Sequence, residues 1–462
     1  MLLPALTSLI LTATPHTFRV DYFHTGDSHQ ETFAIDRLVV EPLAWPGNPD
    51  APLDDTNAGV YFFEVRDLAT HKALYSRGFA SIFGEWVTTA EGKDTPRTFN
   101  ESFRFPAPAA PVQVALARRD PRTQTFKEVW TFTVDPSDPS VDTSRPAPPG
   151  ALIEIQNRGD PAHKVDLLIL GDGYTPAERG KFEKDARRLT EALFAKSPFK
   201  ERRNDFNVWA LCPPSAESGI SRPSTGIHRR SPLGATYDAF GSERYILTFD
   251  NHALRDAASF APYELMEILV NANTYGGGGI FNLYSTAAAG SAWSPYLFVH
   301  EFGHHMAGLA DEYFTSDAPV ENPPERMEPW EPNVTALRAP ERLKWKNQVA
   351  QATPLPTPWD KERFESWEKD VQKRRRQIRA NRQPESDMDA LFVEEKVAET
   401  RLLGGQTFAG KVGAFEGANY ESRGFFRPEL DCVMFSRDDV PFCSVCRNAL
   451  NRIIDLYAKA AR

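Results

Sequence analysis

The chain has 462 residues, of which 41% are hydrophobic, 25% charged and 11% aromatic. These proportions are typical of a folded globular protein, so they exclude a disordered, collagen-like or coiled-coil chain. The net charge of −10 argues against nucleic acid as the main partner, because phosphate binding requires a basic field. At about 100–200 residues per domain, the length predicts two or three domains.

Residues 1–16 contain a short apolar run, from Leu2 to Ala13, that ends in small residues. This pattern favours a secretory signal peptide, although no Lys or Arg precedes the run. The alternative is a packed or frayed N-terminal segment. The run is too short to span a bilayer and no later stretch is long and apolar enough, so we expect no transmembrane segment. The sequence therefore predicts a secreted or periplasmic protein.

Residues 17–135 show a β pattern. Short β-branched or aromatic runs at 59–65, 111–116 and 129–134 are bounded by turn residues, and strong helical periodicity is absent. Several strands at this spacing predict an all-β sandwich domain. Residues 136–150 are polar and rich in proline, which predicts an interdomain linker.

In residues 151–462, expected strands alternate with expected helices, which predicts a second domain of α/β or α+β type. A continuous apolar run at 165–170 predicts a buried strand, and Thr175 followed by Pro176 predicts the start of a helix reaching Ala195. Two further strands are expected at 206–211 and 245–249. Residues 359–403 are rich in charged residues and predict a helical insertion of one or two helices, whose basic cluster is expected to be a solvated face.

The segment from His300 to His304 has the sequence HEFGH, an HExxH pattern. Ser294 is expected to cap a helix with Pro295 in its first turn, and Gly308 is expected to end that helix. On such a helix the two histidines lie one turn apart and can bind one Zn²⁺, with Glu301 beside the metal as general base. The alternative is a buried helix with two core histidines.

A catalytic zinc usually needs a third protein ligand. No histidine follows His305 in the sequence, and His305 itself points away from His304 on a helix. The remaining candidates are Asp311 and Glu312, which follow the glycine turn. We favour Asp311 as the ligand and expect Glu312 to hold a ligand histidine in place.

Cys432, Cys443 and Cys446 lie close together in the sequence. We expect a disulfide between Cys432 and one of the other two, with buried free thiols as the alternative. Cys443 and Cys446 could also form half of a zinc site, but no second CxxC or HxxxH motif lies nearby to complete it.

The segment HEFGHHMAGLADEY at 300–313 resembles the extended signature of the IgA-peptidase (M64) family of zinc metallopeptidases. Further stretches are similar to the same family: 170–174, 215–219, 275–280, 416–420, 432–434, 442–446 and, upstream, 81–86 and 101–106. The resemblance implies a metzincin-like, zincin-type peptidase domain with a carboxylate as third zinc ligand. It also implies that Met434 lies in a methionine turn beneath the metal.

Together these features predict a zinc-dependent endopeptidase with a protein or peptide substrate. Gly277, Gly278 and Gly279 could form an edge that pairs with an extended peptide, or a flexible connection. Tyr420 could donate to an oxyanion, or be a packed tyrosine. Two alternative functions are a binding protein that uses its β-sandwich and a zinc amidohydrolase acting on cell-wall peptides.

Overall fold

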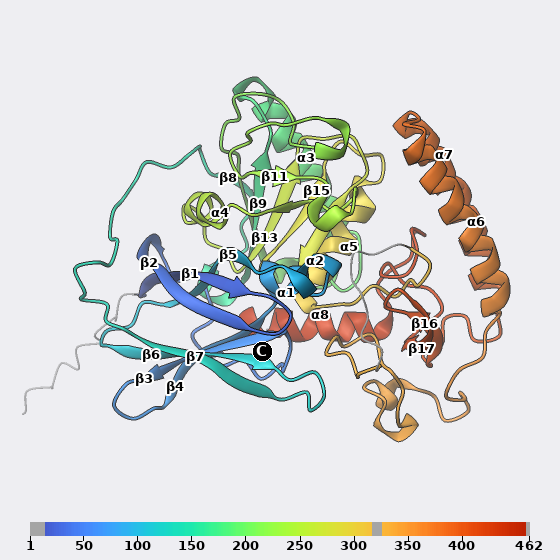
Figure 1. The fold of residues 1–462 in the computed structure, drawn as a ribbon, viewed down its shortest axis with the longest axis horizontal. Helices are drawn as coiled ribbons and strands as arrows, with labels where there is room; N and C mark the ends of the chain where they lie inside the picture. Colours follow the sequence, from blue (N-terminus) through green and yellow to red (C-terminus); the bar gives the residue numbers. More distant parts are fainter. Residues whose placement is uncertain (1–13, 317–325, 459–462) are drawn as a thin grey trace, which may run out of the picture.

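Residues 14–316 and 326–458 are described by a computed structural model. The N-terminal part folds into two antiparallel sheets that share a core, as predicted for a β-sandwich (Figure 1). Phe63 of one sheet packs on Phe103 of the other, with ring centroids 5.0 Å apart. The first sheet has the order β2-β1-β5, built from β1 (His16–Gly26), β2 (Glu31–Ala44) and β5 (Arg97–Pro106). The second has the order β4-β3-β6-β7, built from β3 (Tyr61–Asp67), β4 (Ala73–Phe79), β6 (Val112–Arg119) and β7 (Phe126–Val134).

The C-terminal part is built on a six-stranded mixed sheet with the order β14-β15-β13-β9-β10-β8. The four central strands are parallel, and the two edge strands, β14 and β8, run antiparallel to their neighbours. The sheet consists of β8 (Ile153–Gln156), β9 (Val165–Asp172), β10 (Phe206–Leu211), β13 (Leu265–Val270), β14 (Gly277–Ile280) and β15 (Tyr284–Ala288). The mixed α/β architecture of this part was also predicted.

Every residue of β9 is buried, because both faces of the sheet are covered. Leu167 and Ile169 pack on the side of α3 (Arg179–Phe194), α5 (Ser294–Ala307) and α8 (Ser444–Tyr457). Leu168 and Leu170 pack on the opposite side, in a cluster that includes α4 (Asn251–Ala258) and α1 (Ile82–Trp86) of the N-terminal part. A continuous apolar core therefore joins the sandwich to the sheet.

The predicted helical insertion forms a hairpin of two helices, α6 (Lys361–Ala380) and α7 (Glu385–Gly404), at the far edge of the molecule (Figure 1). Phe364 and Phe392 anchor the hairpin in the same core as α5. The remaining elements are α2 (Ala90–Asp94), the 3-10 turn η2 (Pro176–Glu178), β11 (Ala235–Thr236), β12 (Leu247–Thr248), β16 (Phe415–Ala418) and β17 (Glu421–Arg427). Further short 3-10 turns lie in the loops.

Several local predictions can be compared with these elements. Thr175 and Glu178 form a capping box at the predicted helix start, whose first turn is the 3-10 turn η2 before α3. The predicted strand at 245–249 is reduced to the two residues of β12. Residues 136–150 form no helix or strand beyond one bridge between Val39 and Asp142, and the domain boundary there stays a prediction. The predicted signal peptide lies, apart from its last three residues, outside the described residues. Among the described residues, no helix is both long and apolar enough to cross a membrane.

The predicted disulfide is wrong. All four cysteines are free, and the Sγ atoms of Cys432 and Cys446 are 3.9 Å apart, whereas a disulfide bond is about 2.05 Å long. The three C-terminal thiols converge with a fourth side chain instead.

Candidate metal centre

Helix α5 carries the HExxH pattern on the side that faces a cavity. Its apolar residues are buried in the core, and Gly308 ends it with a left-handed φ of +58°. Pro295 lies in the first turn, as predicted. The predicted cap is wrong, because Ser294 is the first residue of the helix and the N-cap position belongs to Trp293, without a side-chain cap bond.

His300, His304 and Asp311 converge on one point. The Nε2 atoms of the two histidines are 3.1 Å apart, and Asp311 Oδ1 lies 3.0 Å from the first and 3.3 Å from the second. Ligands about 2.0–2.1 Å from a tetrahedral zinc are separated by roughly 3.3 Å, so the three atoms have the spacing of one zinc coordination sphere. These donors therefore fit a metal ion.

Backbone carbonyls hold both rings in the orientation that a metal requires. His300 Nδ1 donates to Val433 O at 2.9 Å, and His304 Nδ1 donates to Leu309 O at 2.5 Å. With the proton on Nδ1, each Nε2 presents a lone pair toward the other and toward Asp311. Such an arrangement of three lone pairs requires a cation among them.

The charges of the cluster support the same requirement. Burial lowers the pKa of His304, but the carboxylates of Asp311 and Glu301 outweigh it and raise that pKa to about 9. Burial likewise disfavours the ionised form of Asp311, yet the two histidines hold its pKa well below the usual range. Either a proton or a metal cation satisfies this group of donors.

Met434 lies directly under α5. A Cβ atom placed on Gly303 would be 3.0 Å from Met434 Sδ, so the close approach of this turn to the helix needs a glycine. Two hydrogen bonds tie the same turn to the site: Glu312 N donates to Met434 O, and Val433 O accepts from His300. The turn thus sets the position of one histidine.

Glu301 is buried beside the histidines and against the glycine strand β14. Burial raises the pKa of its carboxyl group, while His300 and His304 partly oppose this effect. A Cβ on Gly277 would lie 3.1 Å from Glu301 Oε1, and a Cβ on Gly279 would lie 2.4 Å from the carbonyl oxygen of Glu301. The glycines therefore allow β14 to lie directly against the HExxH helix.

We expect Gly279→Ala to destabilise the protein by about 1–3 kcal/mol, the usual cost of overpacking, because the new methyl group meets backbone that cannot rotate away. Gly180→Ala in α3 is the matched control, since a Cβ there meets nothing within 4 Å. Thermal melting of both variants checks this prediction. An unchanged melting temperature in Gly279→Ala would show that β14 can move away from α5.

A cavity of about 300 Å³ opens over Glu301 and the convergent donors. Its walls come from both parts of the chain: Gly84 and Glu85 of α1 on one side, β14 and residues around Tyr420 on the others. Burial raises the pKa of Glu85 to about 7. The resemblance at 81–86 covers Glu85 but does not mark it as a site residue, because only the packing of α1 in the tertiary structure brings it to the cavity.

Tyr420 stands in the left-handed turn between β16 and β17, with φ +62°. Its hydroxyl group donates to Asp311 Oδ2 at the edge of the cavity. The tyrosine is therefore next to the donors and not merely part of the core.

Glu312 does not lie with the histidine pair. Its carboxylate accepts from Asn333 and points to Cys446, so the expectation that it holds a ligand histidine is wrong. The carbonyls of Val433 and Leu309 hold the rings of His300 and His304 instead. His305 faces the sheet, where its ring contacts Met266 N and Ile280 O, so it too is separate from the convergent donors.

Comparison with known protein families gives two matches. The family model described as IgA Peptidase M64 matches residues 153–454, and the model described as Peptidase M64 N-terminus matches residues 12–131. A search of curated proteins found no match. The larger family match contains the whole six-stranded sheet, α5 and the convergent donors.

Proposed function

We propose that this chain, which belongs to the IgA peptidase M64 family and is therefore a peptidase, is a zinc-dependent endopeptidase. His300, His304 and Asp311 are the proposed zinc ligands, with Asp311 preferred over Glu312. The observation that carries the proposal is the convergence of two Nε2 lone pairs and one carboxylate oxygen at about 3.0–3.3 Å from one another.

A zinc ion bound there supplies Lewis acidity, which lowers the pKa of water and polarises the peptide carbonyl. Glu301 takes the proton from the attacking water and returns it to the leaving amine, as a general base and then a general acid. Its buried carboxyl group, with a raised pKa, suits both transfers. The histidine rings are kept in place by Val433 and Leu309, so the donors need no rearrangement before reaction.

The proposed substrate-binding edge is β14, with Gly277, Gly278 and Gly279. In an antiparallel pair, every second residue points its backbone N–H and C=O groups away from the partner strand. In β14, which pairs with β15, these residues are Gly277 and Gly279. Gly277 already pairs with Arg244 and Ile246. We therefore assign Gly279 as the residue that pairs with an extended peptide over the cavity.

Tyr420 is proposed to donate to the oxyanion that forms on the peptide carbonyl. Tyr420→Phe should lower kcat by about 10²–10³-fold, the usual cost of losing one such donor, while the zinc content stays the same. Tyr237→Phe, which loses a tyrosine hydrogen bond to Thr274 O outside the cavity, is the matched control. If Tyr420→Phe loses zinc and not turnover rate, the tyrosine serves only to hold Asp311.

The proposed function is tested on the wild-type protein by zinc analysis and by digestion of casein, immunoglobulin A and muropeptides. We expect the wild-type protein to cleave protein substrates, a chelator to stop this cleavage and added zinc to restore it. Cleavage of muropeptides alone would indicate a cell-wall amidohydrolase. Protein cleavage that withstands complete removal of zinc would contradict the proposal.

We also propose that the protein is secreted or periplasmic. This rests on the apolar run from Leu2 to Ala13. Sequencing the N-terminus of the protein recovered from a cell fraction and from the medium tests it, and an uncleaved chain confined to the cytosol would contradict it.

A further inference from the structure

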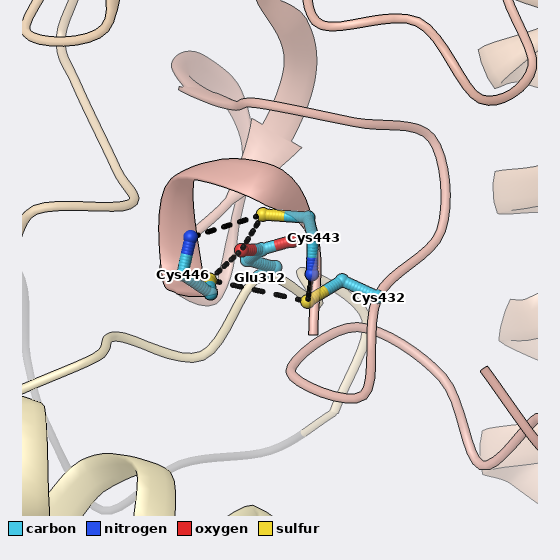
Figure 2. A group of neighbouring side chains, drawn as sticks. All are labelled: Glu312, Cys432, Cys443 and Cys446. Carbon is cyan, nitrogen blue, oxygen red and sulfur yellow. Dashed lines mark hydrogen bonds between the residues drawn. The ribbon is translucent and has the colours of Figure 1, made fainter. Parts of the chain in front are cut away.

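A second cluster of metal-ligating side chains lies outside the proposed catalytic site. It consists of Glu312, Cys432, Cys443 and Cys446, all buried, with one donor atom of each within 4.8 Å of the others. Figure 2 shows the three sulfur atoms and the carboxylate pointing toward one another, although they come from three separate segments of the chain. No part of the proposed peptidase chemistry uses this cluster.

The distances between the four side chains leave room for one tetrahedral metal ion at their centre. Zinc–sulfur bonds of about 2.3 Å place two thiolates roughly 3.8 Å apart, and a zinc–oxygen bond of about 2.0–2.2 Å places sulfur and oxygen roughly 3.5–3.7 Å apart. The Sγ atoms of Cys432 and Cys446 are 3.9 Å apart. Glu312 Oε1 lies 3.2 Å from Cys446 Sγ and 3.9 Å from Cys443 Sγ.

Backbone N–H groups point at two of the three sulfur atoms. Cys432 Sγ accepts from the backbone N–H groups of Met434 and Cys443, at 3.5 and 3.2 Å, and Cys443 Sγ accepts from Cys446 N at 3.4 Å. Such donors stabilise a thiolate, which is the form that binds metal. Arg427, which is fully buried, adds a positive charge that interacts with Glu312 and Cys432.

Glu312 supplies an independent observation. Its side chain has no exposed surface, and its Oε2 atom makes no hydrogen bond within the described part of the chain. A buried carboxylate oxygen without a donor is costly, and thiols are weak donors. A cation held by the other oxygen, Oε1, lowers that cost because it neutralises the charge of the carboxylate.

We propose that Glu312, Cys432, Cys443 and Cys446 bind a second zinc ion, which has a structural role. Four protein ligands close the coordination sphere, as in structural zinc sites, and three thiolates select zinc over hard cations. This ion joins the loop after α5, the methionine turn and the start of α8. Because Glu312 follows Asp311 and Cys432 precedes Met434 by two residues, the second ion fixes the floor of the proposed catalytic site.

The test counts zinc in the full-length wild-type protein and in two variants. We expect two zinc ions per chain in the wild type and one in the double variant His300→Ala/His304→Ala, which removes two ligands of the first site. Replacing the remaining zinc by Co²⁺ should give the intense near-ultraviolet absorption of cobalt–thiolate bonds. Cys446→Ser in the same background should lose that absorption, and Cys212→Ser, outside the cluster, should keep it.

A measurement on the double variant covers the case in which Cys446→Ser fails to fold. With zinc bound, only Cys212 should react with an alkylating reagent, and a chelator should expose the other three thiols. A folded double variant without metal overturns the proposal, as does a disulfide between Cys432 and Cys446 found by peptide mapping. Proteolysis that persists in the double variant would instead contradict the proposed peptidase mechanism and leave this second site untouched.

Discussion

Glu301→Gln is expected to lower kcat/KM by about 10²–10⁴-fold, the range that a positioned general base contributes. Glutamine has the size of glutamate but cannot take a proton from water. Zinc content should not change, because Glu301 is not among the three convergent donors. The melting temperature should stay the same or rise, since the variant no longer buries an ionisable carboxyl group whose pKa burial has raised. Peptide cleavage assays, metal analysis and thermal melting check the three parts.

Glu85→Gln is the matched control for this variant, because it makes the same substitution at another buried carboxyl group that lines the cavity. It removes a carboxyl group without touching the proton acceptor beside the histidines, so its effect on kcat/KM should be far smaller. Equal losses in the two variants would mean that the cavity needs negative charge in general. More than a tenth of wild-type activity in Glu301→Gln would exclude Glu301 as the general base.

Asp311→Asn is expected to weaken zinc binding at the first site by more than about 100-fold. Losing a residue that only supports a ligand costs about 10–100-fold, and this change removes the charge of a proposed ligand itself. Proteolysis should be lost with the metal and should not return at micromolar zinc. Equilibrium dialysis with metal analysis, together with activity against a protein substrate, measures both effects.

Glu312→Gln tests the other candidate for the third zinc ligand, because it makes the same acid-to-amide change in the neighbouring residue. It should leave zinc at the histidine pair and weaken only the proposed thiolate site. If Glu312→Gln removes zinc from the histidine pair and Asp311→Asn does not, the assignment of the third ligand is reversed.

The proposed thiolate site changes how the peptidase domain is understood. The loop that carries Asp311 and the turn that carries Met434 approach each other through the bond from Glu312 N to Met434 O. A metal ion just behind that bond would hold both segments without a disulfide. Chelators would then act at two places, and loss of stability and loss of activity would occur at different chelator strengths.

Much of this protein could be predicted from local patterns. The HExxH helix, its glycine stop at Gly308 and the buried strand at 165–170 are local, because helix periodicity, turn residues and continuous apolar runs act over a few neighbours. The absence of histidine after His305 reduced the choice of a third ligand to two adjacent acids. The division into a β part and an α/β part was equally visible in the patterns.

Only the tertiary structure showed that Asp311 lies with the histidine pair and Glu312 does not, because adjacent side chains in an irregular loop can point to opposite sides. It also joined Glu312 to Cys432, Cys443 and Cys446, which corrected the predicted disulfide: spacing shows that thiols are near in sequence, but not which fourth group meets them. Glu85 entered the cavity wall through the packing of α1 on the sheet. Sequence by itself determined the elements and the donor types, whereas contacts between distant segments decided which donors share a site.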